Sequence, residues 1–318
     1  MCALFGYLDC GKRVPMRTLQ KLVQALANAS EVRGHHAAGI ANNYNSTLRI
    51  FKRPKPAHRL RFRMPDGTAA VMGHTRYTTQ GTQKRNCNNH PFRGNAGTEF
   101  ALAHNGVLYN DTELRLRYAL PDTDIETDSY IAVQLIESQQ ELNFDSLRYA
   151  AEQVRGYFTF TVLDEHDNLY IVKGESPLCL IYYPSIGLYV YASTKEILTD
   201  ALKHLHVRMP RGELIPLDEG ELLRVGHDGL IMRERYTVHE DDYMFLYRHW
   251  YGSYLTGFDE TPDQNDEDYL MLAELCGYYG VDPETVQTLR NLGYSYDEIE
   301  SFLCDPESYG TELAIAEL

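Results

Sequence analysis

Several features that would assign a protein to a known class are missing from this sequence of 318 residues. No apolar run reaches the roughly 18 residues that a membrane-spanning helix requires, and the beginning of the chain lacks the basic segment and apolar core of a secretory signal. The six cysteines form no CxxC pair and no zinc-ligand spacing. We therefore expect a cytoplasmic protein with reduced thiols, no membrane association, no metal and no cofactor.

Basic residues are almost absent from the last quarter of the chain. Residues 237–318 contain 19 acidic and 2 basic residues, whereas the rest of the chain is nearly balanced, with 26 acidic and 28 basic residues. Such a change of charge indicates a domain boundary, which we place near 237–240. Residues 2–236 are expected to form one domain and residues 237–318 an acidic extension. The excess of negative charge argues against nucleic acid as a partner.

The acidic extension carries helical signals. Four tyrosines recur at helical spacing between residues 243 and 254, which indicates packing and not a cofactor site. A helix is expected to begin at Asp282-Pro283 and to end at Gly293. We expect a small, tyrosine-rich helical element that serves docking or oligomerisation.

Short polar clusters follow apolar segments in the first 236 residues. One strand is expected to end at Arg76, and Phe100–Ala103 leads into Asn105-Gly106. Arg76 either forms a structural salt bridge or grips a carboxylate with two hydrogen bonds. The Asn-Gly pair either forms a hairpin turn or supplies two donors to an oxyanion. Asp128 stands at the start of an expected helix, where it favours the helix N-terminus electrostatically.

Cys2 is the candidate nucleophile. If Met1 is removed, the thiol of Cys2 lies beside a free α-amino group, whose pKa is ordinarily about 7.7–8.0. That amine can act as the base that activates the thiol, as it does for an N-terminal threonine. The alternative is that Cys2 is a small, inert residue buried at the start of a strand.

Cys2 and five motifs occur in a fixed order along the chain. The motifs are Arg33-Gly34…Gly39, Gly73-His74-Thr75-Arg76-Tyr77…Thr79…Gly81, Asn89-His90-Pro91, His104-Asn105-Gly106 and Thr127-Asp128. In this order they resemble the class II glutamine amidotransferase domain, an N-terminal-nucleophile hydrolase that also occurs in glucosamine-6-phosphate synthase and amidophosphoribosyltransferase. The resemblance covers about residues 2–236 and implies an α+β fold, a four-layer αββα sandwich.

The resemblance implies a role for each matching residue. Cys2 would be the nucleophile and, through its amine, the base, while Asn105 and Gly106 would form the oxyanion hole. Arg76 would bind the α-carboxylate of L-glutamine, and Asp128 would bind its α-amino group. The residues that would frame the pocket are Arg33, Tyr77 and Thr79.

Two positions depart from the sugar-phosphate branch of this family. Gln80 stands where that branch has a histidine, and Tyr77 stands where it has a tryptophan. Tyrosine at this place is more similar to the amidophosphoribosyltransferase branch. The subfamily is therefore left open, whereas the glutaminase step is common to both branches.

The function implied is hydrolysis of glutamine to glutamate and ammonia through a thioester on Cys2. No phosphate-binding loop, pyrophosphatase-type loop or sugar isomerase follows residue 236, so we expect a separate synthase protein to accept the ammonia. A second copy of the chain is a further expected partner. Two alternatives stay open, namely a glutamine-sensing or scaffolding module with little turnover and a related hydrolase that acts on another amide.

Overall fold

The structure, a computed structural model, describes residues 2–205, 209–239, 276, 288–289 and 299. The chain divides into two compact units, Met1–Val238 and His239–Leu318. The helices and the tyrosine repeat expected in the acidic extension lie outside the described residues. Of the few positions described in the second unit, Cys276, Leu289 and Ile299 are buried.

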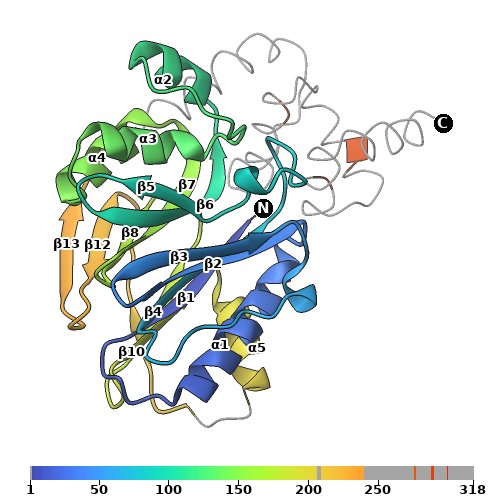
Figure 1. The fold of residues 1–318 in the computed structure, drawn as a ribbon, viewed down its shortest axis with the longest axis vertical. Coiled ribbons are helices and arrows are strands. Elements are labelled where there is room, and N and C mark those ends of the chain that lie inside the picture. The colour runs from blue at the N-terminus through green and yellow to red at the C-terminus, as the bar shows by residue number, and fades with distance from the viewer. Residues whose placement is uncertain (1, 206–208, 240–275, 277–287, 290–298, 300–318) are drawn as a thin grey trace, which may run out of the picture. The chain divides into compact units, whose positions relative to one another are not determined.

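Two antiparallel sheets form the centre of the first unit (Figure 1). The first sheet has the strand order β11-β9-β10-β1-β4-β2-β3 and the second the order β13-β12-β8-β7-β6-β5. The strands of the first sheet are β1 (Ala3–Asp9), β2 (Ala37–Tyr44), β3 (Thr47–Arg53), β4 (Ala70–Arg76), β9 (Cys179–Tyr183), β10 (Leu188–Ala192) and β11 (Glu213–Ile215). Those of the second are β5 (Phe92–Asn95), β6 (Glu99–Leu108), β7 (Gly156–Asp164), β8 (Leu169–Lys173), β12 (Glu221–Val225) and β13 (Ile231–Arg235).

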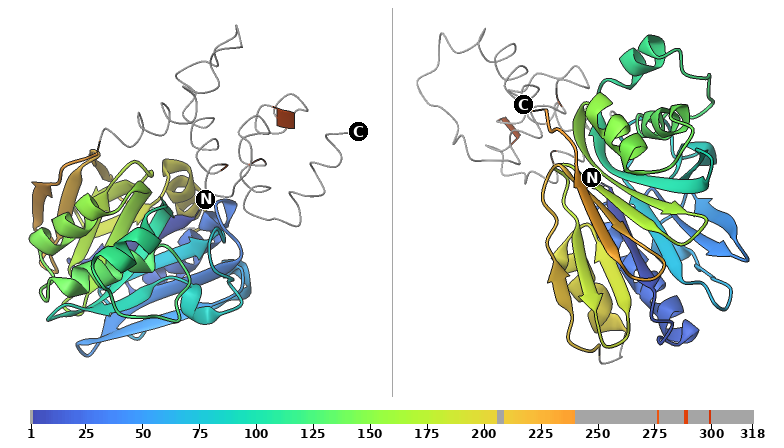
Figure 2. Two further views of the ribbon diagram at one scale, coloured as in Figure 1. Left: turned by 90° about the horizontal axis from the view of Figure 1, so that it is seen from above. Right: turned by 90° about the vertical axis from the view of Figure 1, so that its left-hand side faces the viewer.

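Helices cover the outer faces of both sheets (Figures 1 and 2). The α-helices of the first unit are α1 (Met16–Ala29), α2 (Asp111–Arg117), α3 (Tyr130–Ser138), α4 (Phe144–Gln153) and α5 (Lys195–His204). Helix α1 forms where leucines recur at helical spacing, and these leucines are buried. Strands β2 and β3 form a hairpin, and a short 3-10 turn, Ala57–Arg59, follows β3.

Alternation along the strands divides the apolar residues among three clusters. On β1, Phe5 packs with Leu22 of α1 on the outer side, whereas the neighbouring Leu4 faces the second sheet. On the other side of the molecule, Phe160 of β7 packs with Ile131 of α3. The layers are therefore helix, sheet, sheet and helix, which confirms the α+β sandwich that the resemblance implied.

The space between the sheets becomes polar toward the end at which β1 begins. His74 of β4 donates from Nε2 to the backbone carbonyl of His104 on β6 at 2.9 Å, which joins the two sheets. His90 stacks on His74 with ring centroids 4.1 Å apart. Burial lowers the pKa of His74 and of His104 to about 3 and holds the pKa of His90 well below its ordinary value. All three rings are therefore neutral.

These buried histidines should make the domain sensitive to acid. Between a pH of about 6.5, where unfolded histidine titrates, and a pH of about 3, the unfolded state binds more protons than the folded state. Stability is therefore complete above pH 6.5, and each ring should remove about 1.4 kcal/mol of unfolding free energy for every pH unit below it. Urea unfolding at pH 7.5, 6.5 and 5.5 measures this slope.

Two variants make the test specific. His104→Asn keeps an acceptor for the Ser129 hydroxyl, which lies 2.8 Å from His104 Nδ1, but cannot titrate, so its slope should be shallower. His35→Gln removes an exposed histidine and should leave the slope as it is. Equal slopes for the wild type and His104→Asn would contradict the argument.

Candidate active site

Cys2 lies directly before β1, with 8% of its surface exposed. The pairing of β1 with β4 sets it beside Arg76, the last residue of β4. The Cys2 thiol donates a hydrogen bond to the backbone carbonyl of Tyr77 at 3.3 Å. Arg33 donates from Nε to the backbone carbonyl of Cys2 at 3.0 Å. Residues far apart in the sequence are thus assembled around one thiol.

Two opposite charges act on this thiol. Burial raises the pKa of Cys2 above its ordinary value, because the low dielectric of the interior disfavours a thiolate. The backbone hydrogen bond at Tyr77 and the charge of Arg76 lower that pKa, and the carboxylate of Asp128 raises it. The net effect leaves Cys2 as a neutral thiol, so nucleophilic attack requires a base.

Arg76 is anchored within the protein, with 2% of its surface exposed. Its Nη1 donates to Oδ1 of Asn89 at 2.9 Å. Its Nη2 donates to the backbone carbonyls of Gln80 and of Gly81, the latter at 2.8 Å. The guanidinium therefore also holds the loop that follows β4, in which the half-buried Thr79 lies.

Asp128 is held by β6. Its Oδ2 accepts a hydrogen bond from the backbone N–H of Leu108 at 2.7 Å, so the side chain bonds to a strand and not to the first turn of α3. Its Oδ1 lies 3.4 Å from the hydroxyl of Ser129, which in turn contacts His104. Burial raises the pKa of Asp128, while the Leu108 N–H and the charge of Arg76 lower it.

The Asn105-Gly106 pair lies inside β6, which continues to Leu108. The hairpin interpretation of this pair is wrong, because both residues pair with β7. Gly106 has a φ of +136°, and a Cβ atom there would come within 1.8 Å of the Tyr157 carbonyl oxygen, so no other residue fits.

Asn105 is fully buried, and within the described part of the chain neither polar atom of its side chain has a hydrogen-bond partner. An unpaired buried amide costs about 1–3 kcal/mol.

Three residues that contact the candidate site were assigned no role from the sequence. Asn89 holds Arg76, Ser129 lies beside Asp128, and the ring of His36 accepts a hydrogen bond from the backbone N–H of Thr78. Each of the three lies within or next to a motif named above. Their contacts, however, join parts of the chain that no local spacing connects.

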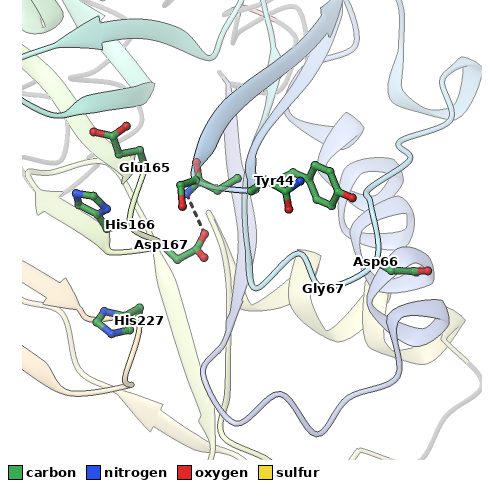
Figure 3. A pocket seen from close by; sticks show the side chains of 10 residues that line it. Tyr44, Asp66, Gly67, Glu165, His166, Asp167 and His227 are labelled. Carbon is green, nitrogen blue, oxygen red and sulfur yellow. Dashed lines mark hydrogen bonds between the residues drawn. The ribbon is translucent and has the colours of Figure 1, made fainter.

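A hollow of about 540 Å³ lies among the β2–β3, β7–β8 and β12–β13 turns and contains none of the predicted site residues (Figure 3). Asn43 donates to Oδ1 of Asp167 at 2.9 Å between two of these turns. The carboxylate of Asp164 accepts the backbone N–H groups of His166 and Asn168 within its own turn. These bonds shape the turns, and we assign no function to the hollow.

No three histidine, cysteine, aspartate or glutamate side chains among the described residues converge as metal ligands would. None of the helices described has the length and the apolar character of a membrane span.

The αββα sandwich, with a thiol just before a central strand, is the fold of the N-terminal-nucleophile hydrolases. Residues 74–200 match the family model described as a glutamine amidotransferase domain. The chain is 33% identical over 190 residues to the glutamine–fructose-6-phosphate aminotransferase (isomerizing) of Staphylococcus epidermidis, which covers 56% of this chain and 30% of that protein. It is 31% identical over 261 residues to the protein of the same name from Staphylococcus aureus, with 77% and 39% covered.

Solved structures show the same fold. Glutamine phosphoribosylpyrophosphate amidotransferase from B. subtilis, complexed with ADP and GMP, aligns with a TM-score of 0.57 and 21% identity over 75% of this chain and 50% of that one. A structure described as the allosteric regulatory enzyme of purine biosynthesis aligns with a TM-score of 0.58 and 20% identity, with the same coverage. The chain contains a class II glutamine amidotransferase domain, and it spans less than half the length of the two staphylococcal relatives.

Proposed function

We propose that the first unit hydrolyses the side-chain amide of L-glutamine to glutamate and ammonia through a thioester on Cys2. The observation that carries the proposal is the pair of buried, opposite charges, Arg76 and Asp128, that act on one thiol. Glutamine is a zwitterion, so a site that selects it needs one fixed cation and one fixed anion. We assign Arg76 to the α-carboxylate and Asp128 to the α-ammonium group.

The proposed reaction begins when removal of Met1 frees the α-amine of Cys2. The amine takes the thiol proton, and the sulfur attacks the carbon of the side-chain amide. The resulting oxyanion accepts hydrogen bonds from the Asn105 side chain and the Gly106 N–H, and one such donor is typically worth about 2.7–4 kcal/mol. The carbon–nitrogen bond then breaks, and the amine returns its proton as ammonia leaves. Water hydrolyses the thioester, which releases glutamate and restores the thiol.

Three residues frame the proposed pocket. Arg33 holds the main chain of Cys2, and Tyr77 supplies the carbonyl that accepts the thiol hydrogen. Thr79 lies on the loop that Arg76 anchors. We assign these three to the placement of the nucleophile and of the substrate.

The combination of groups favours a glutaminase over the two alternatives. A glutamine sensor needs Arg76 and Asp128 but has no use for a nucleophile with an oxyanion hole. A hydrolase of another amide needs Cys2 and Asn105 but has no use for the pair of charges that fits an α-amino acid. The occurrence of both sets at one thiol supports glutamine hydrolysis.

The nucleophile can be tested directly. The purified protein should have lost one methionine from its intact mass, and a glutamine-like diazoketone should label Cys2. Cys2→Ala should abolish both labelling and glutamate release, because no other group replaces the sulfur. Cys10→Ala is the matched control and should keep both activities. Glutamate release by pure Cys2→Ala would show that the mechanism is wrong.

The oxyanion and substrate roles should separate in steady-state kinetics. Asn105→Ala should lower kcat by about 10²–10³-fold and change KM little, because its hydrogen bond strengthens in the transition state. Asp128→Asn should lower kcat/KM by an amount that corresponds to a loss of about 2–5 kcal/mol of transition-state stabilisation. The reason is that it leaves the substrate ammonium without a counter-charge. A normal kcat for Asn105→Ala would refute the oxyanion assignment.

The pH profile adds an independent measure of Asp128. Only the ionised carboxylate binds an ammonium group, and burial raises the pKa of Asp128. For the wild type, kcat/KM should therefore decline on the acidic side at a higher pH than an ordinary aspartate would produce. In Asp128→Asn the contribution of the carboxylate should be lost, and only the acidic decline that comes from protonation of the Cys2 α-amine should remain.

We propose further that the ammonia passes to a synthase on a separate polypeptide and that the acidic extension docks the two proteins. Support comes from charge, since residues 237–318 carry 19 acidic and 2 basic residues. Attraction between exposed charges fades beyond a Debye length of about 8 Å at physiological salt. Charge would thus steer the encounter, and the tyrosines between residues 243 and 254 would supply the apolar contact.

Truncation after residue 238 tests the role of the extension. The shortened protein should keep its glutaminase kcat, because every residue of the candidate site precedes residue 238. It should differ from the full chain in its oligomeric state, measured by light scattering, or in its capture of the synthase. An insoluble truncated protein would show instead that the extension completes the fold.

A further inference from the structure

His36 forms hydrogen bonds with the backbone on both sides of Tyr77. It lies in the segment between the 3-10 turn Ser30–Val32 and β2, which is packed against the end of β4. A Cβ atom at Gly34 would be 2.5 Å from the Arg76 carbonyl carbon, so the two backbones are in direct contact. The backbone N–H of His36 donates to the Arg76 carbonyl at 3.0 Å. Its ring Nδ1 accepts the N–H of Thr78, also at 3.0 Å.

The second of these bonds acts on the nucleophile through one rigid group. The Tyr77 carbonyl and the Thr78 N–H belong to the same peptide unit, which is planar. His36 binds the N–H of that unit, and the thiol of Cys2 donates to its oxygen at 3.3 Å. The ring of His36 also packs against that of Tyr77, with centroids 4.7 Å apart. The imidazole therefore fixes the direction in which the carbonyl meets the thiol.

The remaining site groups are held by other residues. Arg76 is bonded to Asn89, and Asp128 is bonded to the N–H of Leu108. Loss of the His36 ring bond would let the Tyr77–Thr78 peptide turn about its neighbouring dihedrals, while these two charged groups keep their anchors. The effect should fall on the thiol and not on the affinity for an amino acid.

We infer that His36 is a positioning residue for Cys2, which it orients through the Tyr77–Thr78 peptide. The inference rests on the proposed function in taking Cys2 as the nucleophile. The hydrogen bond between the thiol and the carbonyl exists, however, whether or not glutamine is hydrolysed. A fixed acceptor restricts the thiol to one rotamer, and a correctly aimed nucleophile raises the rate of attack.

The chemistry of the ring suggests matched variants. Only an unprotonated Nδ1 can accept the Thr78 N–H. An asparagine Oδ1 occupies the same position relative to Cβ as the histidine Nδ1, whereas a glutamine Oε1 extends one bond further. His36→Asn should therefore preserve the bond, and His36→Gln should lose it. His35→Gln is the control, because His35 is the exposed neighbour, and its described contacts with His36 and Tyr77 are edge contacts between rings.

Two measurements on the full chain test the inference. In steady-state kinetics, His36→Gln should lower kcat about tenfold, the size of one net hydrogen bond, and should change KM by less than about threefold. His36→Asn and His35→Gln should both stay within about twofold of the wild type. The second measurement is the infrared S–H stretching band of Cys2, isolated by subtracting the spectrum of Cys2→Ala. It should move to higher frequency in His36→Gln, where the thiol loses its fixed acceptor, and should stay in place in the other two variants.

The outcomes separate the two proposals. A wild-type protein without glutaminase activity but with the expected shifts of the S–H band would overturn the proposed function and leave the role of His36 intact. Equal behaviour of His36→Asn and His36→Gln in both measurements would overturn the role of His36. If His36→Gln does not fold, His36→Ala removes the same acceptor with less volume and carries the same expectations.

Discussion

The hydrogen bond from His74 to the carbonyl of His104 is a directional link between the two sheets beneath the candidate active site. Cys2 and Arg76 belong to the first sheet, and Asn105 belongs to the second. Apolar contact alone is non-directional and permits one sheet to slide over the other, whereas a hydrogen bond fixes both distance and angle. The placement of Asn105 and Gly106 relative to the Cys2 thiol therefore depends in part on this buried, neutral histidine.

Much of the fold could be predicted because its causes are local. Helix α1 follows from leucines at helical spacing, and the opposite directions of Leu4 and Phe5 follow from strand alternation. The arrangement of the two sheets was implied by the family resemblance and could not have been derived from the strand patterns. A continuous apolar run such as that of β1 indicates a strand buried on both faces but does not say what covers each face.

The candidate site was predictable only in part for a related reason. Cys2, Arg76 and Asp128 can each be picked out from their immediate sequence neighbours. The structure brings all three within electrostatic reach of one another. The contact of His36 with Thr78 joins positions 42 residues apart, and it depends on the close approach that Gly34 permits. Asn105-Gly106 could be read as a turn, and only pairing with β7 decides otherwise.

The unusual residue at position 80 has a structural explanation. Arg76 binds the backbone carbonyls of Gln80 and Gly81, so its grip on the loop does not depend on the side chain at position 80. Glutamine in place of the histidine that the resemblance implies for the sugar-phosphate branch is therefore compatible with the same placement of Arg76. Tyr77 likewise offers its main chain to Cys2, while its ring lies against His36.

The outer strands of the two sheets have a consequence for solubility. An exposed edge can recruit another chain unless it is short or charged. The first sheet ends in β3, which exposes Arg49 and Arg53, and in β11, which has 3 residues. The second ends in the 4-residue β5 and in β13, which exposes Arg233 and Arg235 with Glu234 between them. Short length or exposed charge at these four edges therefore makes pairing with the edge of another sheet less favourable.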